Sequence, residues 1–436
     1  MKNRGFLFMV LFFFVLGASA FAGRLETIQS GTPNDLHAAD YHPSDSYALV
    51  AGDGVFRYDS SGLTMISNPG RFFDVDWRPQ GDFALLVGEF GAIYQYDGTN
   101  LTPLSSPTAA PLNGIAFSPT GDQAVIVGAG GAFLVWEKGV IVDHSLAGGI
   151  TFEGITWVPD GSSALAIGIE NFANEEIVRW DRNSAVVEWS GPAVWPGGIS
   201  YHPINGYALI IEDWGHAAIY DKTGYTQIET GYEQMTDGLN SVDWSPDGKV
   251  ALITGAWYHG PFPGLKTFME YDGSDFNALR MFQNGNNIYE GVAWKSDSSI
   301  ALVVGMEGEL ALYHPDPAIV GNIYCDKDTY TGGEVLKLFV DLNNGGATPV
   351  TVDAFVSVSI DYAQRLWWPN FGSQMNFVTV NLLAGQSINN VKILETQTNL
   401  VKYQKNFTWE FWILESGNLS YESVLSYDVF RGIVIP

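Results

Sequence analysis

Carboxylates and aromatic side chains are the residues of this sequence whose types and spacing could do chemistry. A histidine facing two carboxylates would suffice for acid–base catalysis, as in a lyase or hydrolase, with His216 or His259 beside Glu170, Asp213 or Glu307. The chain has no G-x-S-x-G turn, H-E-x-x-H pair, cysteine pair, phosphate loop or EF-hand loop. We therefore expect binding rather than catalysis, without a cofactor, and keep the enzyme as the alternative.

The candidate binding residues share one expected location, the loops at one end of a repeated group of strands. They are Glu89, Glu170, Trp195, Asp213, Trp214, His216, Trp257, Tyr258, His259, Tyr289 and Glu307. Two of these loops, 170–176 and 256–265, are expected to be enlarged. Loops on a rigid scaffold often carry binding residues, so this face is expected to take a protein, peptide, glycan or cation. The structural alternative is that these side chains only pack against neighbouring loops.

The charge balance narrows the classes of partner. The 436 residues include 48 acidic and 21 basic ones, a formal net charge of −27. Binding to nucleic acid needs clustered Lys and Arg, so this class is excluded, and anionic lipid is disfavoured for the same reason. Attraction of calcium is the functional alternative to solubility, and it gives a third hypothesis, a calcium-stabilised cell-surface component.

Residues 1–22 have the pattern of a signal peptide. Lys2 and Arg4 precede an apolar run over 5–16, and small residues end the segment at Ala20 or Ala22. The apolar run is shorter than the roughly 20 residues that span a bilayer. We expect cleavage there and export to the periplasm, the cell surface or the medium, with no membrane insertion of the mature chain.

A seven-fold repeat organises the next 300 residues. Each copy reads small residue, Val, Ile or Ala, small or acidic residue, aromatic, and most continue with Pro and a Gly or Asp turn, as in Trp244-Ser-Pro-Asp-Gly. The repeated aromatics are Tyr41, Trp77, Phe117, Trp157, Tyr201, Trp244 and Trp294. An apolar run, an aromatic–acid pair and a last short run follow in most copies. Four short strands per roughly 40 residues are typical of a β-propeller blade.

The ends of the repeat predict how a ring would close. The seventh copy supplies three strands and then breaks at Pro315 and Pro317, whereas the segment 24–29, R-L-E-T-I-Q, is an unmatched strand before the first copy. We expect this N-terminal strand to pair into the last blade.

The motifs W-V-P-D-G at 157–161 and W-S-P-D-G at 244–248 resemble the WD-repeat and TolB-type propeller repeats of bacterial exported proteins. The resemblance covers residues 24–317 and implies a rigid disc for protein or ligand contacts. Several copies lack the Asp-Gly or the Pro, and the Gly-His of intracellular WD repeats is not evident in them, so the partners of those proteins are not implied.

Residues 318–436 follow another pattern. Alternating apolar positions, as in G-E-V-L-K-L-F-V-D-L, predict a seven-strand antiparallel β-sandwich that resembles the Ig-like modules of bacterial secreted proteins. The predicted organisation is a signal peptide (1–22), a seven-bladed β-propeller (23–317) and an Ig-like β-sandwich (318–436). The predicted function is that of an exported binding or scaffold protein.

Overall fold

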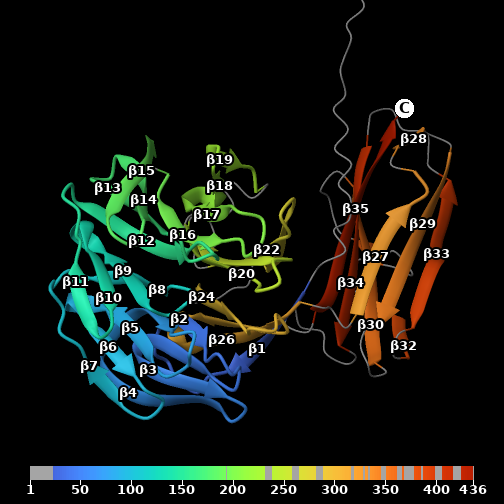
Figure 1. Cartoon of the computed structure of the whole chain (residues 1–436). Helices are drawn as coiled ribbons and strands as arrows, with labels where there is room; N and C mark the ends of the chain where they lie inside the picture. The colour runs from blue at the N-terminus through green and yellow to red at the C-terminus, as the bar shows by residue number, and fades with distance from the viewer. Residues whose placement is uncertain are drawn as a thin grey trace, which may run out of the picture.

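The computed structural model of the chain is all-β, built from many small antiparallel sheets (Figure 1). It describes residues 23–192, 194–230, 238–257, 265–280, 288–315, 319–327, 329–331, 334–344, 350–360, 366–367, 378–383, 386–397, 405–415 and 424–435. Among these residues the helical elements are four 3-10 turns, and no helix is long and apolar enough to cross a membrane.

The repeats form consecutive sheets. The first two share one six-stranded sheet: β2 (Leu36–Tyr41), β3 (Ala48–Asp59), β4 (Gly62–Trp77), β5 (Ala84–Gly88), β6 (Ile93–Tyr96) and β7 (Leu101–Pro103). The next two four-stranded sheets are β8 (Leu112–Phe117), β9 (Gln123–Gly128), β10 (Phe133–Glu137) and β11 (Val140–Asp143), then β12 (Ile150–Trp157), β13 (Ala164–Glu170), β14 (Asn174–Trp180) and β15 (Ala185–Pro192).

Three further four-stranded sheets complete the series. They are β16 (Pro196–Tyr201), β17 (Ala208–Glu212), β18 (Ala217–Asp221) and β19 (Gly224–Ile228); β20 (Gly238–Trp244), β21 (Ala251–Trp257), β22 (Leu265–Tyr271) and β23 (Phe276–Arg280); and β24 (Tyr289–Trp294), β25 (Ala301–Gly305) and β26 (Glu309–His314) with β1 (Arg24–Gln29). The predicted pairing of 24–29 into the last repeat is confirmed, because β1 pairs with β26 from Arg24↔His314 to Gln29↔Glu309.

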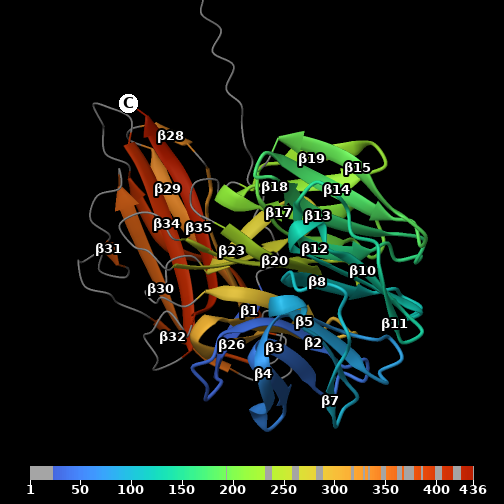
Figure 2. The same ribbon diagram turned by 90° about the vertical axis from the view of Figure 1, so that its left-hand side faces the viewer.

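The first strands of the repeats contact one another in a closed order. Strand β2 contacts β4, and the contacts continue through β8, β12, β16, β20 and β24 back to β2. The second strand of each repeat is almost wholly buried, as in Ala84–Gly88, and apolar side chains of adjacent sheets share common cores. Figures 1 and 2 show these sheets following one another around a common centre.

The small or acidic residue before each repeated aromatic has a structural role. The amide N–H of Trp77 donates to Asp40 Oδ2 at 2.7 Å, and that of Phe117 donates to Asp76 Oδ2 at 2.5 Å. Ser200 Oγ accepts the N–H of Trp244 in the same way at 3.2 Å. Each bond satisfies an amide of the following repeat, which would otherwise be costly to bury.

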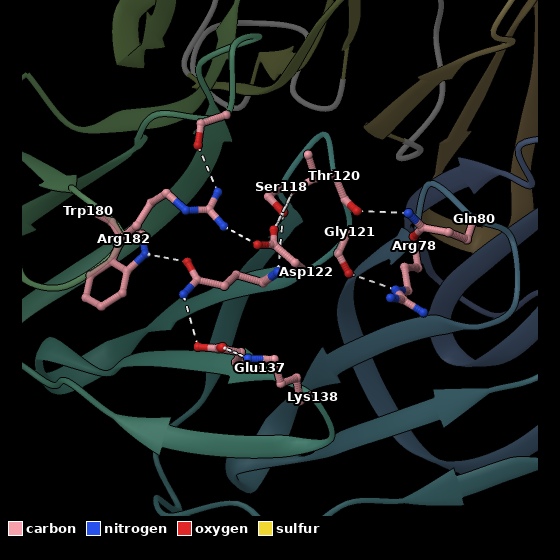
Figure 3. A network of polar contacts seen from close by, with 12 residues as sticks. Arg78, Gln80, Ser118, Thr120, Gly121, Asp122, Glu137, Lys138, Trp180 and Arg182 are labelled. Atoms are coloured by element: carbon pink, nitrogen blue, oxygen red, sulfur yellow. Dashed lines mark hydrogen bonds and ion pairs between the residues drawn. The ribbon is translucent and has the colours of Figure 1, made fainter.

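One end of the sheets, which we name the turn end, carries the turns after the repeated aromatics. Left-handed backbones occur there at equivalent positions, such as Gly81 (φ 72°) and Gly121 (φ 65°). Figure 3 shows how these turns join neighbouring repeats: Arg78 Nε donates to Gly121 O at 2.7 Å, and the Arg182 guanidinium binds Asp122 and Gly161 O.

The turns between third and fourth strands lie at the same end. Three acids of the aromatic–acid pairs accept a hydrogen bond from the backbone N–H two residues further on, at 2.7–2.9 Å: Asp59, Asp97 and Asp221. These carboxylates therefore fix turns, and part of the acidic surplus is structural.

The C-terminal residues form two sheets around one shared core, drawn apart from the repeats in Figure 1. One sheet holds β27 (Ile319–Cys325), β29 (Val335–Asn344) and β33 (Ser387–Gln397). The other holds β28 (Thr329–Thr331), β35 (Val424–Ile435), β34 (Lys405–Glu415), β30 (Val350–Ile360), β31 (Leu366–Trp367) and β32 (Val378–Leu382). The prediction of a seven-strand antiparallel sandwich is wrong in two respects: the described residues form nine strands, and β28 runs parallel to β35, a pairing that the alternation of side chains does not encode.

Candidate functional site

The opposite end of the sheets, which we name the loop end, carries the connections between second and third strands. Four of these connections are 3-10 turns: η1 (Glu89–Gly91), η2 (Ala129–Gly131), η3 (Asp213–Gly215) and η4 (Met306–Gly308). The middle residue of each is left-handed, and three of the four are not glycine: Phe90 (φ 56°), Trp214 (φ 62°) and Glu307 (φ 54°). Left-handed non-glycine residues are uncommon and concentrate at functional sites.

The structure places most of the predicted site residues at this end. Glu89, Asp213, Trp214 and Glu307 lie in the 3-10 turns, Glu170 ends β13, and Trp195 and His216 flank β16 and η3. Tyr289 begins β24 but is fully buried, with its ring centroid 6.1 Å from that of Phe268, so it does not belong to the surface. Tyr258 and His259 lie outside the described residues, and of Trp257 only the backbone is described.

Three of the exposed aromatic residues gather on this end, and we name Phe172, Trp195 and Trp214 the aromatic cluster. Their exposed fractions are 74%, 46% and 51%. The rings of Phe172 and Trp195 lie 5.5 Å apart, and the Asp213 N–H donates to the Trp195 carbonyl at 2.9 Å, which ties η3 to this pair. All three also have left-handed backbones, which are uncommon for residues other than glycine.

The predicted enlarged loop at 170–176 is wrong, because β13 and β14 continue to Glu170 and Asn174 and leave a turn of three residues. The additional residues of this connection extend strands β13 and β14. The side chain of Glu175, in β14, is buried close to that of Glu212. Burial, and next the charge of Glu212, raise the pKa of Glu175 to about 8. Burial raises the pKa of Glu212 to about 7, although the Tyr225 hydroxyl donates to its carboxylate.

A β-bulge occurs at the same position in every first strand, four residues before the repeated aromatic. The bulged residues, which we name the bulge ring, are His37, Phe73, Asn113, Glu153, Gly197, Asn240 and Glu290. A bulge re-aims one side chain out of the alternation. Sequence reasoning missed this ring because residue types vary among the seven copies; the constant spacing from the aromatic was the available signal.

Acid–base groups converge at part of the bulge ring. Arg71 Nε lies 3.0 Å from His37 Nε2 and 3.3 Å from Asp53 Oδ1, and the Glu307 N–H donates to Asp35 Oδ1 at 2.9 Å. Burial and the charge of Arg71 lower the pKa of His37, which favours the neutral imidazole near pH 7.

The two carboxyls of the bulge ring respond to their surroundings in the same way. Burial, and next the charge of Asp35, raise the pKa of Glu290 to about 7; burial and the charge of Asp213 do the same for Glu153. Deeper along the first strands, burial raises the pKa of Asp40 to about 6 and that of Asp74 and Asp243 to about 7. Burial thus raises the pKa of carboxyl groups on β2, β4, β12, β20 and β24 toward neutral pH.

The backbone N–H of His216 donates to the Asp213 carbonyl at 3.3 Å and closes η3. The acid–base arrangement around His216 stays a prediction. In the described part of the chain, no group of three or more His, Cys, Asp or Glu side chains is arranged to hold a metal ion. The calcium hypothesis therefore stays a prediction.

No protein-family model and no curated protein matches the sequence.

Proposed function

We propose that the chain is an exported binding protein with an N-terminal seven-bladed β-propeller and a C-terminal Ig-like β-sandwich. The closed order of first-strand contacts and the entry of β1 into the last sheet support the propeller. The shared core of two sheets supports the sandwich. In this proposal the sandwich acts as a spacer or attachment unit, and the loop end of the propeller is the recognition surface.

The aromatic cluster is the observation that carries the binding proposal. Exposed rings on strained backbones cost free energy unless they serve a contact. Asp213 lies in η3 with Trp214, and Glu170 stands directly before the turn that holds Phe172. The charge of Asp213 also raises the pKa of Glu153 in the bulge ring. Aromatic faces next to carboxylates favour a ligand that is both apolar and cationic, so the proposed ligand is a peptide segment carrying Lys or Arg.

Fluorescence anisotropy with labelled peptides tests this proposal. Peptides of equal length that carry Lys and Arg, Glu, or only neutral residues are titrated with the mature chain, with a glycan set in parallel. The basic peptides are expected to bind most tightly, and Trp214→Ala or Phe172→Ala is expected to weaken binding about 10- to 30-fold.

Phe90→Ala is the matched control. Phe90 occupies the position in η1 that Trp214 occupies in η3, with a similar φ and an exposed fraction of 83%, but it belongs to another repeat and lies outside the aromatic cluster. Equal losses in all three variants, or preference for neutral peptides or glycans, would contradict the proposed site or its ligand.

A lyase or hydrolase is the second candidate, favoured by His37, Arg71 and Glu290. A neutral imidazole and a carboxyl with a pKa of about 7 are suited to moving a proton at neutral pH. Turnover in a panel of polysaccharide and ester substrates that is abolished by Glu290→Gln, and retained by Trp214→Ala, would replace the binding proposal with this one.

A further inference from the structure

Directly before strand β1, the backbone nitrogen of Gly23 contacts a buried carboxylate. Gly23 N lies 2.6 Å from Oε1 of Glu270, whose exposed fraction is 3%. The Tyr313 hydroxyl donates to the same oxygen at 2.5 Å. Tyr313 belongs to β26, in the same sheet as β1, whereas Glu270 belongs to β22, so this contact joins the start of β1 to another sheet.

The Tyr313 ring leaves no room for a side chain at position 23. A Cβ at position 23 would lie 2.2 Å from Cε2 of the Tyr313 ring, closer than atoms can approach. Only glycine therefore fits between the start of β1 and Tyr313 without moving the ring.

The sequence supplies an independent observation at the same peptide bond. Small residues at Ala20 and Ala22 form the pattern that a signal peptidase cuts, and Gly23 follows directly. The same stretch also allows a cut after Ala20, so the pattern by itself does not choose between the two bonds.

We propose that the signal peptidase hydrolyses the bond between Ala22 and Gly23, and that the new ammonium group of Gly23 pairs with Glu270 to complete the closure of the ring. Water adds its hydroxyl to the Ala22 carbonyl carbon, the C–N bond breaks, and the Gly23 nitrogen leaves as an amine that takes up a proton. An α-amino group has a pKa of about 8 and is charged at neutral pH. The ammonium group places a positive charge beside the buried carboxylate of Glu270, whereas the peptide N–H of an uncut chain is an uncharged donor.

This inference rests on the proposed export, and its two parts are tested separately. Terminal sequencing and intact mass of the exported protein are expected to give Gly23 as the first residue. A first residue of Phe21 or any other position would overturn the assigned cut. Retention of an uncut chain in the cell would instead overturn the proposed export.

The pairing with Glu270 is tested on chains made without export, by a protease that leaves Gly23 as the first residue. Acetylation of Gly23, or one extra alanine before it, is expected to lower the melting temperature by roughly 5 to 10 °C at pH 7. The difference between free and acetylated chains is expected to shrink above pH 9 as the amine loses its proton, and Glu270→Gln is expected to remove it.

Glu26→Gln is the control, because Glu26 lies on β1 and faces His314 at 3.2 Å, away from this contact. It is expected to leave the effect of acetylation unchanged. Equal melting temperatures for the free, acetylated and extended chains would overturn the pairing, and this measurement does not depend on the folding of any Glu270 variant.

Discussion

The two ends of the sheets use acidic residues in opposite ways. At the turn end, Asp59 accepts bonds from Ser61 and Arg57, which lower its pKa to about 2, and hydrogen bonds likewise hold the pKa of Asp122 low. At the loop end, burial raises the pKa of Glu153, Glu175 and Glu290 to about 7 or 8. Carboxylates with donors around them stabilise turns, whereas carboxyls lacking such compensation cost stability and are available for chemistry.

Left-handed residues occur at both ends, but their side chains differ. The non-glycine ones at the turn end are polar or charged: Asp45, Lys138, Arg182 and Ser298. Those at the loop end include the aromatic residues Phe90, Phe172, Trp195 and Trp214, all of which are exposed. The loop end therefore combines left-handed backbones with exposed rings, as a binding surface would.

The largest expected effect is on the pH dependence of stability. Glu175 and Glu212 have folded-state pKa values above the ordinary 4.5, so the folded state holds protons that the unfolded state releases. Their contribution is fully present below pH 4.5 and is lost as the pH rises to about 8, on the order of 2 to 5 kcal/mol for this buried pair. Urea unfolding is expected to give a higher free energy of unfolding at pH 5.5 than at pH 8.

Glu175→Gln is expected to flatten this dependence, whereas Asp59→Asn at the turn end is expected to leave it unchanged over the same range. Stability that rises from pH 5.5 to pH 8 would show that the buried carboxyls are ionised with compensating partners, and the contrast between the two ends would fail.

The second effect is the loss of a bond between repeats. Asp76→Ala removes the acceptor of the Phe117 amide and is expected to destabilise the chain by about 1 to 3 kcal/mol in thermal or urea unfolding. Asp76→Asn keeps an acceptor oxygen and should cost less. If the two variants are equally stable, the amide has another acceptor and the small-or-acidic position is not a structural requirement.

Arg182→Ala sharpens the comparison at the turn end. It removes contacts to Gly161 O and Asp122 and the stacking of the guanidinium over Trp157, at 5.4 Å from the ring. These groups are partly exposed, so the expected loss is about 1 kcal/mol. Peptide affinity in the anisotropy assay should not change; a weaker affinity would mean that the two ends are coupled.

The smallest expected effect has the opposite sign. Trp214→Gly relieves the left-handed backbone at φ 62° and is expected to raise the free energy of unfolding by about 0.5 to 1 kcal/mol while weakening peptide binding. Calorimetry beside the anisotropy assay measures both. A destabilised Trp214→Gly variant would mean that the ring stabilises the fold, and the aromatic cluster would lose its argument for a ligand.

Much of the architecture was predictable because it repeats. Seven copies of one pattern place Trp77, Trp157 and Trp244 at equivalent core positions, and the incomplete seventh copy, together with the unmatched 24–29, predicts the pairing of β1 with β26. Of the candidate site, Trp195, Asp213 and Trp214 were predicted to share one end, since antiparallel strands of fixed length bring equivalent loops to the same side.

The sequence by itself determined the period, the strand pattern and the end of the sheets at which exposed aromatics occur, because these follow from local alternation and from Gly and Pro turns. Only the tertiary structure decided that Glu175 is buried, that Tyr289 is core, and that a bulge re-aims Glu153 and Glu290. Burial and bulges depend on what the neighbouring strands and sheets place against a residue, and that information is distributed over segments 40 or more residues apart.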